Sequence, residues 1–179
     1  MSSFDFESLI ADIPDYPKPG VIFKDITPLL ADPDGFSACI DAITKRFADA
    51  GVTKVLGAEA RGFMIGAPVA YKLGAGFVPA RKLGKLPRAC YKQEYQLEYG
   101  TDTIEIHEDA VSSEDVVLVV DDLIATGGTA IASVQLAQQA GAQVAGLAFL
   151  LELTPFNARA AVAKITDAEF FSLVQVEAY

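Results

Sequence analysis

The sequence predicts an α/β protein with a doubly wound, mainly parallel sheet and flanking helices. Residues 116–120 form an unbroken apolar run, mostly β-branched, which is typical of a strand covered on both faces. Strand-like and helix-like segments alternate on both sides of this run, at the spacing of βαβ units. The sequence shows no repeat and no interdomain linker, so we expect residues 1–179 to form a single domain.

The individual elements follow from the same patterns. A helix is predicted at residues 36–47, because Phe36, Ile40, Ile43 and Phe47 recur at helical spacing. Residues 54–58 predict a strand, residues 62–73 a helix and residues 77–80 a further strand.

The strand at 116–120 comes next. After it, residues 129–140 predict a helix that Gly141 can cap, and residues 144–151 the next strand.

Two segments depart from the alternation. Residues 1–35 are rich in proline and glycine and predict a cover over the core rather than a core strand. Residues 81–107 hold a basic cluster followed by an alternating segment. They predict a hairpin or long loop inserted at the end of a strand, and insertions of this kind are often flexible lids.

Composition excludes several classes of function. Fourteen basic and 24 acidic residues give a net charge of −10, which is unsuited to general nucleic-acid binding or to a membrane-surface helix. Cys39, Cys90 and the single histidine, His107, have no metal-ligand spacing. Two cysteines and no recognisable signal peptide predict a cytoplasmic protein. Residues 123–151 lack charge but contain glycines and glutamines, so we expect no membrane span there.

The strongest candidate site follows the central strand. Asp121 and Asp122 stand at its predicted carboxyl end, where ligands of open α/β sheets bind. The loop that follows, Ala125, Thr126, Gly127, Gly128 and Thr129, opens a helix. Its N–H groups can converge on an anion, so it predicts a phosphate cradle. Carboxylates accept hydrogen bonds from sugar hydroxyls or hold Mg²⁺, and the combination therefore predicts a phosphorylated sugar as ligand.

Two further basic features point to a polyanion. Glu59, Ala60, Arg61 and Gly62 end one predicted strand and open a helix, which predicts a second anion-binding turn at the same edge of the sheet. The insertion holds five cations, namely Arg81, Lys82, Lys85, Arg88 and Lys92. A charge run is commonly a solvated face, but beside two anion-binding loops we expect it to face the substrate.

The block VVLVVDDLIATGGTA resembles the phosphoribosyl-pyrophosphate (PRPP) binding motif of the type I phosphoribosyltransferases. Five further blocks are similar to the adenine branch of that family. They are residues 19–28 (PGVIFKDITP), 59–63 (EARGF), 81–87 (RKLGKLP), 96–100 (QLEYG) and 170–173 (FFSL). Together the blocks span nearly the whole chain.

The resemblance implies purine salvage, in which adenine attacks C1′ of PRPP to give AMP and pyrophosphate. It implies an N-terminal hood, residues 1–35, over the base, with the purine pocket formed by Val21, Phe23 and Lys24. Arginine is common in the family where this chain has Lys24. Ala60 and Arg61 would hold pyrophosphate, with Arg61 stabilising its departure.

It further implies that a lid, residues 81–107, closes over PRPP through Arg81, Lys82 and Lys85. Lys82 or Lys85 would reach the neighbouring site of a homodimer. Glu98 would manage the proton at the purine N7, with Tyr99 near the reaction centre.

The implied cofactor is Mg²⁺. The resemblance has it held mainly by PRPP, pyrophosphate and water, with Asp121 as its protein contact. Asp121 and Asp122 would bind the ribose hydroxyls, and residues 125–129 the 5′-phosphate.

Two alternatives remain open at this point. The first is a phosphoribosyltransferase for hypoxanthine, guanine or xanthine. The second is a PRPP-sensing regulator of the same fold, although such a regulator calls for a DNA-binding domain and a basic face.

Overall fold

The computed structural model describes residues 4–96 and 100–177. Its centre is a seven-stranded sheet in the order β5-β6-β4-β3-β7-β8-β9. The strands are β3 (Lys54–Ala58), β4 (Gly76–Lys82), β5 (Cys90–Gln96), β6 (Thr101–His107), β7 (Val116–Ile124), β8 (Gln143–Leu153) and β9 (Glu169–Val176). Five neighbouring strands, β4, β3, β7, β8 and β9, pair in parallel. The other two are antiparallel: β6 pairs with β4, and β5 pairs with β6. The predicted doubly wound, mainly parallel α/β fold is confirmed.

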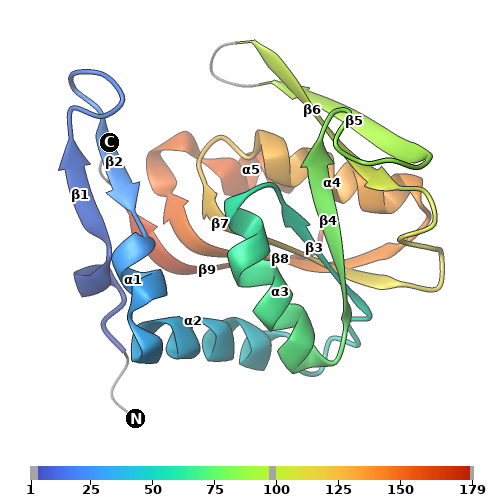
Figure 1. The fold of residues 1–179 in the computed structure, drawn as a ribbon, viewed down its shortest axis with the longest axis horizontal. Helices are drawn as coiled ribbons and strands as arrows, with labels where there is room; N and C mark the ends of the chain where they lie inside the picture. Colours follow the sequence, from blue (N-terminus) through green and yellow to red (C-terminus); the bar gives the residue numbers. More distant parts are fainter. Residues whose placement is uncertain (1–3, 97–99, 178–179) are drawn as a thin grey trace.

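Helices cover both faces of the sheet (Figure 1). One face is covered by α2 (Pro33–Arg46) and α3 (Arg61–Leu73), the other by α4 (Gly128–Gln139) and α5 (Ala158–Val162). Each face buries its own apolar cluster, which includes Leu118 and Val120 on the first side and Val117 and Val119 on the second. Alternate residues of β7 therefore point into two cores, as its unbroken apolar sequence predicts.

The hood is a separate two-stranded antiparallel sheet. Its strands are β1 (Ala11–Pro14) and β2 (Ile22–Asp25), preceded by the 3₁₀ turn η1 (Glu7–Leu9) and followed by α1 (Thr27–Ala31). The hood lies at one end of the main sheet and the β5–β6 hairpin at the other (Figure 1). The carboxyl ends of β3 and β7 lie between them, which places the candidate site in the space bounded by these two additions.

Several element boundaries differ from the sequence prediction. The central strand, β7, continues four residues beyond 120, to Ile124, because its pairing with β8 persists at Asp121, Leu123 and Ile124. Asp121 and Asp122 thus lie within the strand, not beyond its end. Sequence patterns did not predict β1, β2, α1, α5, the 3₁₀ turn η2 (Thr154–Phe156) or β9. Within the described ranges, no helix has the length and apolar character needed to span a bilayer.

Candidate active site

The carboxylate pair of β7 is the most buried charged feature of the site. Asp122 is 4% exposed, and its N–H donates to Oδ1 of Asp121 at 2.9 Å. Burial raises the pKa of Asp121 well above its ordinary value, and the charge of Asp122 adds to the rise. Burial also raises the pKa of Asp122, although the guanidinium of Arg61 opposes this shift. The pair is costly to hold ionised without donors or cations from outside the protein.

The turn between β3 and α3 brings Arg61 to this pair. Nε of Arg61 lies 3.0 Å from Oδ2 of Asp122, without the angle of a hydrogen bond. That oxygen has no hydrogen-bond donor among the described residues. The peptide bond between Glu59 and Ala60 is cis. Arg61 is therefore close enough to screen the carboxylate, while leaving an acceptor for a ligand.

Gly62 allows this close approach. A methyl carbon at Gly62 would lie 2.8 Å from Oδ1 of Asp121 and 3.1 Å from the carbonyl oxygen of Val120. Only a residue without a side chain lets the start of α3 lie against β7 at this point. The predicted anion-binding turn and the carboxylate pair thus share one sheet edge.

The predicted phosphate cradle opens α4. Gly127 has a φ of +90°, a conformation that favours glycine. The N–H of Ile131 donates to Gly127 O at 2.8 Å, so the N–H groups before it point out of the helix end. Residues 125–129 line a cavity of about 160 Å³ with Asp121, Tyr95 and Gln96. This cavity joins the Asp121 carboxylate to the cradle.

The hairpin lies directly on the cradle. A methyl carbon at Gly128 would be 2.7 Å from the carbonyl oxygen of Gln96 and 3.2 Å from the ring of Tyr95. The hydroxyl of Tyr95 donates a hydrogen bond to Asp102 Oδ2 at 3.4 Å, and the side chain of Thr129 is its second hydrogen-bond partner. Burial raises the pKa of Tyr95, which therefore stays protonated as a donor. Tyr95 connects the hairpin to the cradle, a role that its alternating sequence did not reveal.

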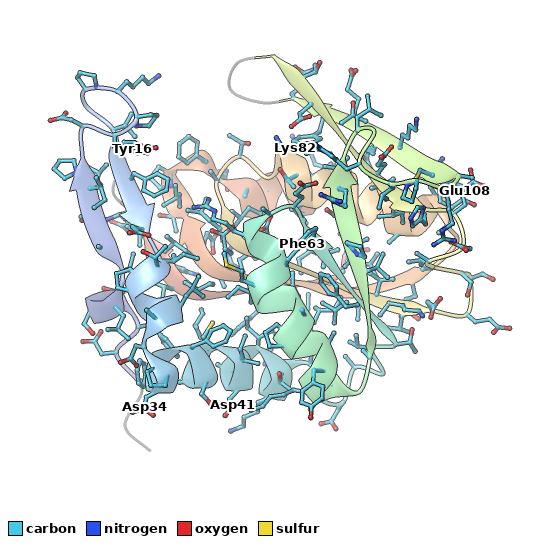
Figure 2. All side chains as sticks on the ribbon, viewed as in Figure 1. Tyr16, Asp34, Asp41, Phe63, Lys82 and Glu108 are labelled. Atoms are coloured by element: carbon cyan, nitrogen blue, oxygen red, sulfur yellow. The ribbon has the colours of Figure 1, made fainter. Side chains whose placement is uncertain are left out.

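Four of the five predicted lid cations have carboxylate partners. Arg81 makes two 3.1 Å hydrogen bonds to Glu59, and Lys82 donates to Asp102 at 3.0 Å. Figure 2 shows Lys82 at the end of β4 beside the hairpin. The remaining pairs are Arg88 with Asp109 and Lys92 with Glu105, the latter at 4.0 Å. Within the described residues, Lys85 is the member of this cluster with no carboxylate within 4.0 Å.

These ion pairs partly neutralise the basic cluster. The hydrogen bonds from Arg81 hold the pKa of Glu59 below its ordinary value, and the bond to Asp102 raises the pKa of Lys82. Four of the five cations are therefore paired with carboxylates of the same chain, and Lys85 is the fifth. Two of these cations are held in place by Asp102, which sequence reasoning did not single out, and by Glu59, which it named only as part of the anion-binding turn.

The hood residues separate into two groups. Phe23 lies edge-on to Tyr16 with ring centroids 5.3 Å apart, and the guanidinium carbon of Arg61 is 5.7 Å from its ring centre. Phe23 thus faces the site. Lys24 points elsewhere: it is 8% exposed, donates to Asp12 at 2.6 Å and lines a different cavity with Glu7, Ile10, Asp12 and Val176.

The backbone of Val21 is engaged within the hood turn. Its N–H donates to Lys18 O at 3.3 Å, and its carbonyl accepts from Tyr16 N–H at 3.2 Å. A carbonyl oxygen has two lone pairs, and this bond uses one of them. The predicted catalytic residues Glu98 and Tyr99 lie outside the described residues.

A phosphoribosyl transferase domain model matches residues 25–174. The chain is also 52% identical, over 171 residues, to the adenine phosphoribosyltransferase of Acaryochloris marina. This match covers 96% of the present chain and 99% of that protein. The chain belongs to the adenine phosphoribosyltransferase family. The predicted family resemblance is confirmed.

Solved phosphoribosyltransferase structures share the fold over nearly their whole length. The adenine phosphoribosyltransferase of Rhodothermus marinus is 46% identical, with a TM-score of 0.89 and coverage of 96% of each chain. The Giardia lamblia enzyme, solved with 9-deazaadenine, is 37% identical, with a TM-score of 0.91 and coverage of 97% of each chain. The similarity in fold therefore extends beyond the parallel core to nearly the whole chain.

Proposed function

We propose that this chain transfers the 5-phosphoribosyl group of PRPP to adenine, giving AMP and pyrophosphate in purine salvage. The observation that carries the proposal is the convergence of Asp121, Asp122, Arg61 and the cradle at one sheet edge. The relatives named adenine phosphoribosyltransferase support the choice of base. In the reaction, adenine forms a bond to C1′ while the bond from C1′ to pyrophosphate breaks.

Each group has a role set by its chemistry. The 5′-phosphate would take the outward N–H groups of residues 125–129 and the hydroxyls of Thr126 and Thr129. Ribose hydroxyls would donate to Asp121 and Asp122, giving Oδ2 of Asp122 the donor that it lacks. Arg61 and Ala60 would bind pyrophosphate, and Arg61 would stabilise the charge that develops on it.

The base would lie between the hood and the sheet. Phe23 presents its ring for stacking, and Val21 has a carbonyl lone pair for the base edge. Glu98 would exchange the proton at N7, with Tyr99 beside the reacting carbon. Lys24, which pairs with Asp12, would support the hood from behind. Lys82 or Lys85 would complete the partner's site in a homodimer, while Arg81 would fasten the 81–87 segment.

Mg²⁺ fits this site as a companion of the substrate. In the described part of the chain no three His, Cys, Asp or Glu side chains gather to hold a metal, and Asp122 Oδ2 is a buried acceptor without a donor. The ion would therefore take most of its ligands from PRPP and water, with Asp121 contributing directly or through water. When bound, it neutralises charge on the leaving pyrophosphate. The cytoplasmic location stays a prediction.

The decisive assay uses purified protein, PRPP and Mg²⁺ with adenine, hypoxanthine, guanine or xanthine in turn, and measures the nucleotide formed. AMP as the main product supports the proposal, whereas a preference for another base contradicts it. Thr126→Ala tests the cradle separately, since losing one hydroxyl donor to phosphate should weaken PRPP about tenfold in calorimetry. Unchanged affinity would contradict the assignment of residues 125–129.

A further inference from the structure

A charged side chain is buried in the hairpin, and it does not line the cavity at the cradle. Glu105 lies on β6 between Ile104 and Ile106, and all three are 2% exposed or less. Carboxylates are seldom buried among apolar residues unless hydrogen bonds or cations compensate them. The partners of Glu105 therefore indicate what it does.

Glu105 binds the backbone of the turn that follows β4. Its Oε1 accepts hydrogen bonds from the N–H groups of Gly84, at 2.9 Å, and Leu86, at 3.2 Å. The other oxygen, Oε2, lies 4.0 Å from Nζ of Lys92. The two N–H groups are those immediately before and after Lys85, so one oxygen atom holds both flanks of this residue.

Further contacts hold the same turn. The N–H of Lys85 donates to Lys82 O at 3.2 Å, and Arg81 Nη1 donates to Lys85 O at 3.4 Å. Arg81 is itself held by two hydrogen bonds to Glu59, in the predicted pyrophosphate turn. The backbone of Lys85 is thus fixed on both sides, whereas its side chain is exposed.

We propose that Glu105 is a positioning residue, which holds the 83–87 turn so that the ammonium group of Lys85 is presented to the phosphates of PRPP. This inference rests on the proposed function, because it takes Lys85 as a ligand of the substrate. A cation on a fixed turn loses less conformational freedom on binding than one on a loose loop. Glu105 acts only through Lys85 and touches no reacting atom.

Three substitutions separate this role from a purely structural one. Glu105→Ala removes the acceptor of both N–H groups. Glu105→Gln keeps an Oε1 acceptor and removes the charge. Glu108→Ala is the matched control, because Glu108 is an exposed carboxylate three residues further along. If Glu105→Ala does not fold, Glu105→Asp serves instead, since its shorter side chain withdraws the carboxylate from the turn.

The first readout is amide hydrogen exchange at Gly84 and Leu86. We expect exchange to rise at least about tenfold in Glu105→Ala, to recover most of its protection in Glu105→Gln, and to stay at the wild-type rate in Glu108→Ala. Unchanged exchange in Glu105→Ala would overturn the proposed hold on the turn. This measurement needs no substrate, so it stands even if the enzyme uses another base.

The second readout is PRPP affinity by calorimetry in a double-mutant cycle. Glu105→Ala and Lys85→Ala should each weaken PRPP about tenfold, and the double variant should be no weaker than Lys85→Ala alone. If the double variant instead loses PRPP affinity by the product of the two single losses, Glu105 does not act through Lys85 and the proposal is overturned. Failure of the proposed function shows separately, as a wild-type protein that binds PRPP but makes no AMP from adenine.

Discussion

Gly62→Ala tests whether the approach of α3 to β7 sets the position of the ribose site. The added methyl carbon would lie 2.8 Å from Oδ1 of Asp121, whereas ordinary contact begins at 3.4 Å. The carboxylate of Asp121 and the start of α3 must therefore move apart by about 0.6 Å. Because the surrounding side chains are closely packed, this movement is costly. The carbonyl oxygen of Val120, at 3.1 Å, blocks movement in a second direction.

Two opposing effects determine stability. Replacing glycine with alanine stabilises a helix interior by about 1 kcal/mol, and by less at Gly62, which is the second residue of α3. Overpacking costs about 1–3 kcal/mol. The net destabilisation is then about 0–3 kcal/mol, which lowers Tm by at most about 12 °C in a chain of this size. We expect Gly62→Ala to remain folded at 25 °C.

Binding should suffer more than stability. A displaced Asp121 carboxylate loses a hydrogen bond to a ribose hydroxyl, and a bond to a charged group contributes about 1.5–3 kcal/mol. PRPP affinity, measured by calorimetry with Mg²⁺, should fall about 10- to 150-fold.

Gly66→Ala is the matched control. Gly66 lies one turn further along α3, where the new methyl carbon would meet the ring of Phe77 at 3.0 Å. We expect a change in Tm but PRPP affinity within about twofold of wild type. A folded Gly62→Ala protein that binds PRPP as tightly as wild type would refute the reasoning.

Three further predictions address the remaining groups. Asp121→Asn should raise Tm at about pH 7.5 while weakening PRPP. Burial raises the folded-state pKa of Asp121, so ionisation of this carboxyl destabilises the folded protein as pH rises from the unfolded-state pKa through the folded-state pKa. In thermal melts from about pH 5 to 8, Tm should therefore decline less in the variant than in wild type. An equal decline in Tm contradicts the assignment. Glu98→Ala should lower kcat for AMP formation with little change in PRPP affinity, and an unchanged kcat removes the proton-transfer role. Lys85→Ala mixed with Asp121→Ala should regain activity through heterodimers in which one site is intact, whereas no recovery after subunit exchange argues against action across the dimer.

Local patterns were sufficient for the parallel core but not for the end of β7. Its apolar run marked the strand as far as 120, and two adjacent aspartates normally favour a loop. The strand continues because β8 still supplies pairing partners and because Arg61, far away in sequence, screens Asp122. Neither contact can be read from the segment itself.

The basic cluster shows a similar limit. Five cations in one insertion suggested a single positive surface, but the acids that pair with them come from other segments, including Glu59 and Asp102. Pairing between distant positions depends on the sheet register, which composition does not contain. The short hood strands, four residues each, were missed because so few residues carry little periodicity.

The aromatic contact in the hood has an optical consequence. The chain has no tryptophan. Tyr16, labelled in Figure 2, lies half-exposed in the hood turn, and its ring lies against that of Phe23. Tyr16→Trp would therefore place the chain's one indole fluorophore beside the proposed base pocket. Its emission would report the arrival of a purine ring without any label, and separately from turnover. A contact within the hood would in this way become a probe of the neighbouring site.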